Sequence, residues 1–285
     1  MNDIMDIESQ VGLAKKFRSM HERGKFFVLP NAWDVASSRI FEEAGFASVA
    51  TTSAGMMVCL GYPDGEFIPW NEFLAAIRRI SRVVSIPLST DLVSGFGNTV
   101  KEVVSSTMEV IQAGAVGINL EDLKQGDTEL IAETEQCRRI SALKDLSEEI
   151  GVPFVINART DAISHRGKSN LETSIELAIK RSQAYIEAGA DCVYPMGLTD
   201  MNSIVQFVNA VKFTVNIMIR KGIPEIKALR RIGVTRLSFG PSAIYAVMGM
   251  LLDAGKEIIE HSSFTKLIER AIDYEMLNSL AARRK

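Results

Sequence analysis

Acidic, basic and amide side chains stand at the ends of four apolar segments of this chain. The segments cover residues 86–93, 116–122, 153–160 and 213–219, and they carry Asp91, Glu121, Arg159 and Asn216. Carboxylates bind divalent cations, and a planar guanidinium binds a carboxylate or phosphonate through two hydrogen bonds. If the segments are parallel strands of a closed barrel, these side chains converge on its C-terminal mouth, where barrel enzymes carry out their chemistry.

The two carboxylates are candidate metal ligands. Asp91 ends the third strand and Glu121 ends the fourth. Neighbouring strands lie about 4.8 Å apart, so both side chains can reach one cation directly or through water. Mg2+, or Mn2+ in its place, suits such a site because Mg2+ retains several waters and uses one or two carboxylates. The alternative is that each acid caps a following helix or pairs with an arginine at the barrel mouth.

The loop expected after the second strand, residues 51–66, is rich in small side chains. Small residues let backbone N–H groups approach a ligand closely, which favours a cradle for a carboxylate or an oxyanion. Asp64 lies in this loop within a Tyr-Pro-Asp-Gly sequence, which taken alone is a turn signal.

Arg159 is the clearest anion-binding residue. The alternative is a salt bridge to Asp161, Glu121 or Asp122, which is compatible with ligand binding. Other catalytic arrangements lack support: the glycines of residues 91–98 do not have dinucleotide-binding spacing, and no histidine adjoins a candidate nucleophile. The three cysteines, Cys59, Cys137 and Cys192, have no metal-ligand spacing and indicate thiols in a reducing compartment.

The intervening sequence predicts the elements that position these side chains. Eight near-continuously apolar strands are expected at 26–32, 46–53, 86–93, 116–122, 153–160, 191–197, 213–219 and 235–241. Helical periodicity separates them, as in 71–84 and 171–189, and several helices end on glycine just before a strand. This alternation predicts an α/β fold of the (β/α)8 TIM-barrel type.

Length and composition agree with one barrel domain over residues 1–285. We expect an N-terminal helix within 1–25, the barrel over 26–255 and a C-terminal helical extension over 256–285. The net charge of −3, with no long run of one sign, gives no support for nucleic-acid or membrane binding. No apolar run approaches the roughly 20 residues of a membrane span, and the polar start is unlike a signal peptide, so a cytoplasmic protein is expected.

Five motifs in order resemble those of the isocitrate lyase/phosphoenolpyruvate mutase superfamily. They are LPNAWDVASSRIFEEAGF, TTSAG with LGYPD, Asp91 with GFGN, NLED and ARTDA, within residues 26–250. The resemblance implies a (β/α)8 barrel whose eighth helix is swapped between subunits, in a homotetramer or homodimer. It also implies Mg2+-dependent cleavage or formation of C–C or P–C bonds in α-oxo acids.

The resemblance also assigns roles to particular residues. It implies metal binding by Asp91 and Glu121, and a place near metal and substrate for Asp64. Substrate-binding positions are Trp33, Thr52, Ser53, Ala54, Arg159 and Asn216, with Asp34 beside Trp33 in the first-strand segment. The candidate catalytic residues are Asp64, Arg159 and Tyr62, and the candidates for the general acid are Tyr62, Asp64 and a metal-bound water.

Departures from the family pattern narrow the range of reactions expected of this chain. The lyases carry a Cys- and His-containing loop after the fourth strand, whereas here LKQGDTELI follows directly and Cys137 lies far along the next helix. Val93 and Met196 also replace acids. These differences argue against isocitrate or methylisocitrate cleavage by the usual route. The leading hypothesis is a Mg2+-dependent C–C lyase for an oxaloacetate-like acid or 2-oxo-dicarboxylate; the alternatives are phosphonopyruvate hydrolase or mutase-type P–C chemistry and a non-catalytic oxo-acid-binding barrel.

Overall fold

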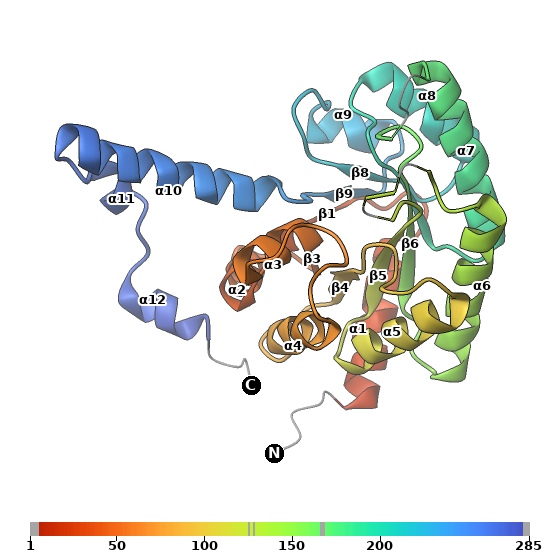
Figure 1. Cartoon of the computed structure of the whole chain (residues 1–285), viewed down its shortest axis with the longest axis horizontal. Helices are drawn as coiled ribbons and strands as arrows, with labels where there is room; N and C mark the ends of the chain where they lie inside the picture. The colour runs from red at the N-terminus through yellow and green to blue at the C-terminus, as the bar shows by residue number, and fades with distance from the viewer. Residues whose placement is uncertain (1–5, 125, 128, 166–168, 282–285) are drawn as a thin grey trace.

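A computed structural model describes residues 6–124, 126–127, 129–165 and 169–281 of the chain. Parallel strands alternate with helices along these residues (Figure 1). The strands are β1 (Phe27–Leu29), β2 (Asn31–Ala32), β3 (Val49–Thr51), β4 (Leu88–Asp91), β5 (Gly117–Glu121), β6 (Val155–Thr160), β7 (Cys192–Pro195), β8 (Asn216–Met218) and β9 (Arg236–Ser238). The helices are α1 (Ile7–Met20), α2 (Val35–Glu43), α3 (Ser53–Leu60), α4 (Trp70–Ser81), α5 (Val100–Gln112), α6 (Glu133–Glu149), α7 (Leu171–Glu187), α8 (Met201–Val211), α9 (Ile226–Arg231), α10 (Ser242–His261), α11 (Thr265–Ile268) and α12 (Tyr274–Ser279).

The strand pairings follow one another around a barrel. One sheet has the order β2-β3-β4-β5-β6-β7 and the other has the order β1-β9-β8, with all the pairs parallel. A bridge between Val193 and Val215 links β7 to β8. The predicted first strand is divided into β1 and β2 at Pro30, which has no N–H to donate, although its carbonyl still accepts from the Ala50 N–H at 2.8 Å. The predicted fold class is confirmed.

Helix α1 closes the end of the barrel opposite the strand C-termini. The Phe17 ring is fully buried, and a Cβ added at Gly117 on β5 would lie only 2.6 Å from it. The Gln10 side chain anchors the helix by donating to the carbonyls of Ile111 and Ala115 at 2.6 and 3.0 Å. Helix α1 thus covers the end of the barrel that lies away from the polar side chains at the strand C-termini.

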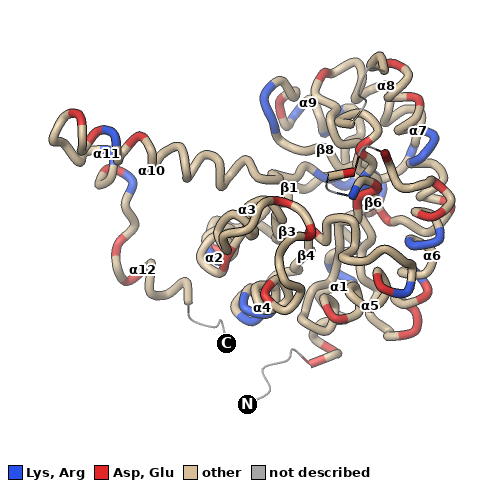
Figure 2. Tube along the Cα trace, viewed as in Figure 1, with Lys and Arg blue, Asp and Glu red and all other residues tan. Residues whose placement is uncertain are grey.

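The last helices depart from the barrel. Helix α10 extends well beyond the barrel body (Figure 1), and Figure 2 shows its N-terminal half free of charged residues. Apolar side chains along it are exposed, including Leu252 at 59 % and Ile259 at 85 %. The chain then returns, because Leu280 is buried and lines a small cavity with Val35 of α2. No helix among the described residues is long and apolar enough to cross a bilayer.

Candidate active site

A cavity of about 410 Å3 opens at the carboxyl ends of the strands. Its walls are mainly polar side chains and the first turn of α3. The residues that line it include Thr52, Ser53, Ala54, Asp64, Ser89, Asp91, Asn119, Arg159, Tyr194, Asn216, Arg220, Lys221, Arg236, Ser238 and Tyr245. A cavity of this size suits a small-molecule ligand.

The segment after β3 is a helix where the sequence predicted a loop. Thr52 is the N-cap of α3, and the helix begins at Ser53. The first N–H groups of a helix have no intrahelical partners and attract negative charge. One is used within the fold, because the Ser53 N–H donates to Asp91 Oδ2 at 2.9 Å. The first turn of α3 therefore places backbone N–H donors beside the cavity. The predicted cradle is the N-terminus of a helix and not an irregular loop.

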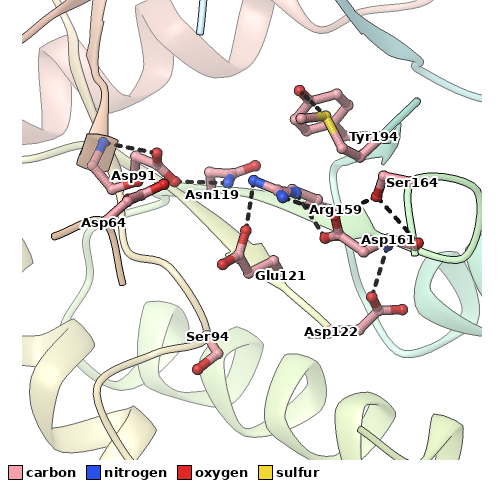
Figure 3. A network of polar contacts seen from close by, with 12 residues as sticks. Asp64, Asp91, Ser94, Asn119, Glu121, Asp122, Arg159, Asp161, Ser164 and Tyr194 are labelled. Atoms are coloured by element: carbon pink, nitrogen blue, oxygen red, sulfur yellow. Dashed lines mark hydrogen bonds and ion pairs between the residues drawn. The ribbon is translucent and has the colours of Figure 1, made fainter. Parts of the chain in front are cut away.

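Asp91 is held in place by hydrogen bonds to residues of its two neighbouring strands. Its Oδ1 accepts from Asn119 Nδ2 at 2.9 Å (Figure 3), while its own N–H donates to Thr51 Oγ1 at 2.9 Å. Asn119 is itself fixed by Asn157, whose Nδ2 donates to Asn119 Oδ1 at 2.8 Å. This chain fixes the orientation of the Asp91 carboxylate at the cavity wall.

Arg159 enters the cavity already paired with acids. Its Nη1 lies 2.6 Å from Glu121 Oε2, and its Nε and Nη2 each donate to Asp161 at 2.8 Å (Figure 3). The salt bridge left open by the sequence is therefore present, to two of the three acids considered. Burial lowers the pKa of Arg159, but Glu121 and Asp161 raise it more, so the guanidinium keeps its charge.

Two acids at the cavity, Asp64 and Glu121, have raised pKa values. Burial, followed by the Asp91 carboxylate, raises the pKa of Asp64. Burial also raises the pKa of Glu121 well above its usual range. Asp161, Asp91 and Asp64 add to this increase, and the Arg159 charge opposes it. Carboxylates thus outnumber the one guanidinium that pairs with them here, and a bound divalent cation would relieve the excess negative charge.

The donor set accordingly suits a cation that retains water. Within the described ranges, no group of three or more His, Cys, Asp or Glu side chains is placed to hold a metal. Asp64 and Asp91 nevertheless both face the cavity. Two carboxylates completed by waters and ligand oxygens match the coordination habits of Mg2+.

Most of the predicted site residues meet at this cavity, namely Thr52, Ser53, Ala54, Asp64, Asp91, Arg159 and Asn216. Three others are placed elsewhere. Glu121 is only 8 % exposed at its side chain and lies against Arg159 instead of lining the cavity. Trp33 packs against the start of α3, since a Cβ added at Gly55 would lie only 2.9 Å from the Cβ of Trp33. The Tyr62 hydroxyl donates to Glu72 Oε1 at 3.0 Å.

Sequence reasoning did not single out Asn119, Tyr194, Arg236 or Ser238, all of which line the cavity. The alternation of side chains along β5 offered a signal for one of them. Asn119 stands two residues before Glu121, so the two residues share a strand face.

Comparisons with known proteins identify the family of this chain. Residues 17–259 match the family described as phosphoenolpyruvate phosphomutase. The chain is 32 % identical over 179 residues to 2-methylisocitrate lyase of Escherichia coli, covering 60 % of this chain and 57 % of that enzyme. It is 27 % identical over 281 residues to 2,3-dimethylmalate lyase of Eubacterium barkeri, covering 94 % of this chain and 93 % of that enzyme.

Solved structures share the fold over nearly the whole chain. The crystal structure of a putative lyase/mutase from Burkholderia cenocepacia superposes with a TM-score of 0.88 at 31 % identity, covering 96 % of this chain and 98 % of that one. A phosphonopyruvate hydrolase in complex with oxalate and Mg2+ superposes with a TM-score of 0.80 at 23 % identity, covering 94 % of each chain.

Proposed function

Because the chain belongs to the phosphoenolpyruvate phosphomutase family, we propose that it is a Mg2+-dependent lyase that cleaves a C–C bond in a small α-oxo carboxylic acid. The substrate class we propose is an oxaloacetate-like acid or a 2-oxo-dicarboxylate. Family membership confirms the resemblance and the type of enzyme predicted from the sequence. The substrate class and the metal are proposals that rest on the site itself.

One observation carries the proposal: the Asp91 carboxylate, fixed by the Ser53 N–H and Asn119, faces the cavity together with Asp64. These two acids would hold Mg2+, or Mn2+ in its place, and Glu121 would contribute charge from behind Arg159. When bound, the ion supplies a Lewis acid that polarises the oxo group. The relative solved with oxalate and Mg2+ supports this choice of ion.

The chain's own groups would orient the acid and stabilise the charge that develops. The first turn of α3 would offer the Ala54 N–H and the Thr52 hydroxyl to a substrate carboxylate, while the Ser53 side chain hydrogen-bonds to Asp64. Such preorganised donors favour the enolate left when a carbon–carbon bond breaks beside a carbonyl. Arg159, immobilised by Glu121 and Asp161, would position the substrate without needing to reorganise.

When the carbon–carbon bond of an oxaloacetate-like acid breaks and CO2 leaves, C3 of the enolate must take up a proton. Asp64 lines the cavity, but as a ligand of the ion it would be ionised, so it would position the water that supplies this proton instead of supplying the proton itself. Cys137 does not fit the role of proton donor: it lies within α6, away from the cavity lining, and burial raises the pKa of its thiol.

The test is turnover of a panel of 2-oxo and 2-hydroxy acids by the purified protein with Mg2+, with pyruvate or glyoxylate as products. We expect Asp91→Ala to lower kcat/KM at least 100-fold, on the order of the loss when one electrostatic group of an active site is removed. Asp145→Ala, at an exposed acid of α6, is the matched control. The lyase proposal fails if no acid is cleaved or if Asp91→Ala leaves the rate unchanged.

The same panel separates the alternatives. Release of inorganic phosphate from phosphonopyruvate would indicate P–C cleavage. A rise in Tm on adding oxo acids without any turnover would indicate a binding protein, because ligand binding stabilises the folded state by mass action.

We also propose that the enzyme is a homotetramer or homodimer in which α10 packs on a second subunit. The exposed apolar side chains of α10, such as Leu252 and Ile259, support this. The mass in solution from light scattering tests it, and a monomer at micromolar concentration would contradict it. The free cysteines agree with the proposed cytoplasmic location.

A further inference from the structure

Arg236 is a buried cation without a partner. Its residue is only 2 % exposed, on β9 inside the barrel, and it lines the active-site cavity. Its Nε and Nη1 atoms are buried and make no hydrogen bond, and no ion pair to Arg236 occurs within the described part of the chain. A buried guanidinium with unused donors is costly, so a fold that keeps one has a use for it.

Other buried arginines of this protein show the contrast. Arg159 is paired with Glu121 and Asp161, and Arg181 is paired with Asp122 at 2.7 Å. In those cases the fold supplies the carboxylate that a buried guanidinium requires. At Arg236 it supplies a cavity instead, so the missing carboxylate can come from a ligand.

The neighbours of Arg236 favour an anionic group at the same place. Asn216 stands directly beside it in the β8–β9 register, and the Asn216 Nδ2 donates to Ser238 Oγ at 3.1 Å. Both residues line the cavity, as do Arg220 and Lys221 in the segment that follows β8. The β8–β9 side of the cavity is therefore cationic.

The opposite side of the cavity is acidic. Asp64 and Asp91 lie there, and β4, which carries Asp91, is separated from β9 by β3 and the β1–β2 strand. A ligand that satisfies both sides needs a metal-chelating end and a second negative charge at the other end. A monocarboxylic oxo acid satisfies only the first requirement.

We propose that Arg236, together with Asn216 and Ser238, forms a second anion subsite that binds the distal carboxylate of a dicarboxylic substrate. This inference rests on the proposed function and reassigns the distal group from Arg159, which is already paired with Glu121 and Asp161. The Arg236 guanidinium would attract the carboxylate and donate to it from Nη2, because Nε and Nη1 are sealed from the cavity, and Asn216 and Ser238 would contribute polar contacts beside it.

Two acids that differ only at the distal group test the subsite. Malate carries a carboxylate where 2-hydroxybutyrate carries a methyl group, and calorimetry with Mg2+ present gives the Kd of each. We expect wild-type protein to bind malate at least tenfold more tightly. Arg236→Met should reduce this preference to within about twofold, and Arg236→Lys should keep part of it, because a lysine retains the charge but lacks the planar guanidinium. Arg138→Met, at an exposed arginine of α6, is the control and should keep the preference.

The stability of the ligand-free protein gives a second, independent readout. Because Arg236 has no partner, Arg236→Met should leave Tm unchanged or raise it, whereas a guanidinium with a structural role would lower Tm on removal. The proposal is overturned if wild type binds the two acids equally or binds neither, if Arg236→Met keeps the preference, or if both Arg236 variants are less stable than wild type. Turnover is not measured, so the lyase proposal can fail while the subsite stands, and the reverse also holds.

Discussion

Burial of His21 makes the stability of this protein depend on pH in a way that one substitution should reveal. The imidazole lies between α1 and β1, with its Nδ1 2.8 Å from the Phe17 carbonyl and its ring edge-on to Phe17 and Phe27 at 4.7 and 4.9 Å. The buried Nε2 has no partner. Burial first, and then the Arg236 and Arg18 charges, lower the pKa of His21 from 6.5 to about 3.

The sign and size of the effect follow from proton linkage. Between pH 6.5 and about 3 the unfolded chain binds a proton at His21 and the folded chain does not, so stability falls as the pH falls through this window. At pH 5 the pH lies roughly 1.5 units below the unfolded-state pKa of 6.5, and each unit is worth about 1.36 kcal/mol, so His21 costs about 2 kcal/mol there relative to pH 7.5.

Urea unfolding at pH 7.5 and pH 5 measures this cost when wild type is compared with His21→Phe. The variant keeps the aromatic packing and loses the hydrogen bond to the Phe17 carbonyl, a loss that is the same at both pH values. Titration of every other group cancels in the difference. We expect the stability of His21→Phe relative to wild type to improve by about 2 kcal/mol on going from pH 7.5 to pH 5. If the difference in unfolding free energy between the two proteins is the same at both pH values, the inference that His21 is buried in its neutral form is refuted.

Two further substitutions probe the surroundings of the site. Tyr62→Phe should leave kcat within about twofold of wild type in the turnover assay, because the hydroxyl donates to Glu72 and Tyr62 does not line the cavity; a hundredfold loss would restore it as a proton donor. Asp122→Asn should lower the free energy of unfolding in urea by about 3 kcal/mol, because the buried carboxylate accepts from Arg181, Tyr185 and the Asp161 N–H. Unchanged stability would show that this network contributes little.

The strands were predictable because a barrel covers both faces of each strand, so apolar runs are long and a polar residue marks where each run reaches the mouth. All eight predicted segments contain observed strands. The interruption at Pro30 was visible in the sequence, but its consequence depends on pairing: the residues on either side bond to different neighbours, β9 and β3. Such pairing across the barrel leaves no local trace in the sequence.

The placement of Asp91 and Arg159 at the cavity was predictable because each stands where an apolar strand reaches the barrel mouth. The placement of a residue was less predictable where it depends on which other side chain packs against it. Glu121 ends its strand as predicted, yet Arg159 lies against it and shields it from the cavity. The position of Tyr62 depends on Glu72, ten residues further on, and spacing alone does not indicate that contact.

Arg236 shows most clearly what the sequence could not reveal. An arginine in a short strand is ordinarily read as surface-facing, and the chemical interest of Arg236 comes from its burial with no hydrogen-bond partner at Nε and Nη1. The cavity then has unmatched acids on one side and an unmatched cation on the other. A divalent ion at Asp64 and Asp91 would attract the same dicarboxylate that Arg236 is proposed to bind, so ion and dicarboxylate should each raise the affinity of the other. Thermodynamic linkage requires the two factors to be equal, and a monocarboxylate that leaves Arg236 unmatched should not gain as much from the ion.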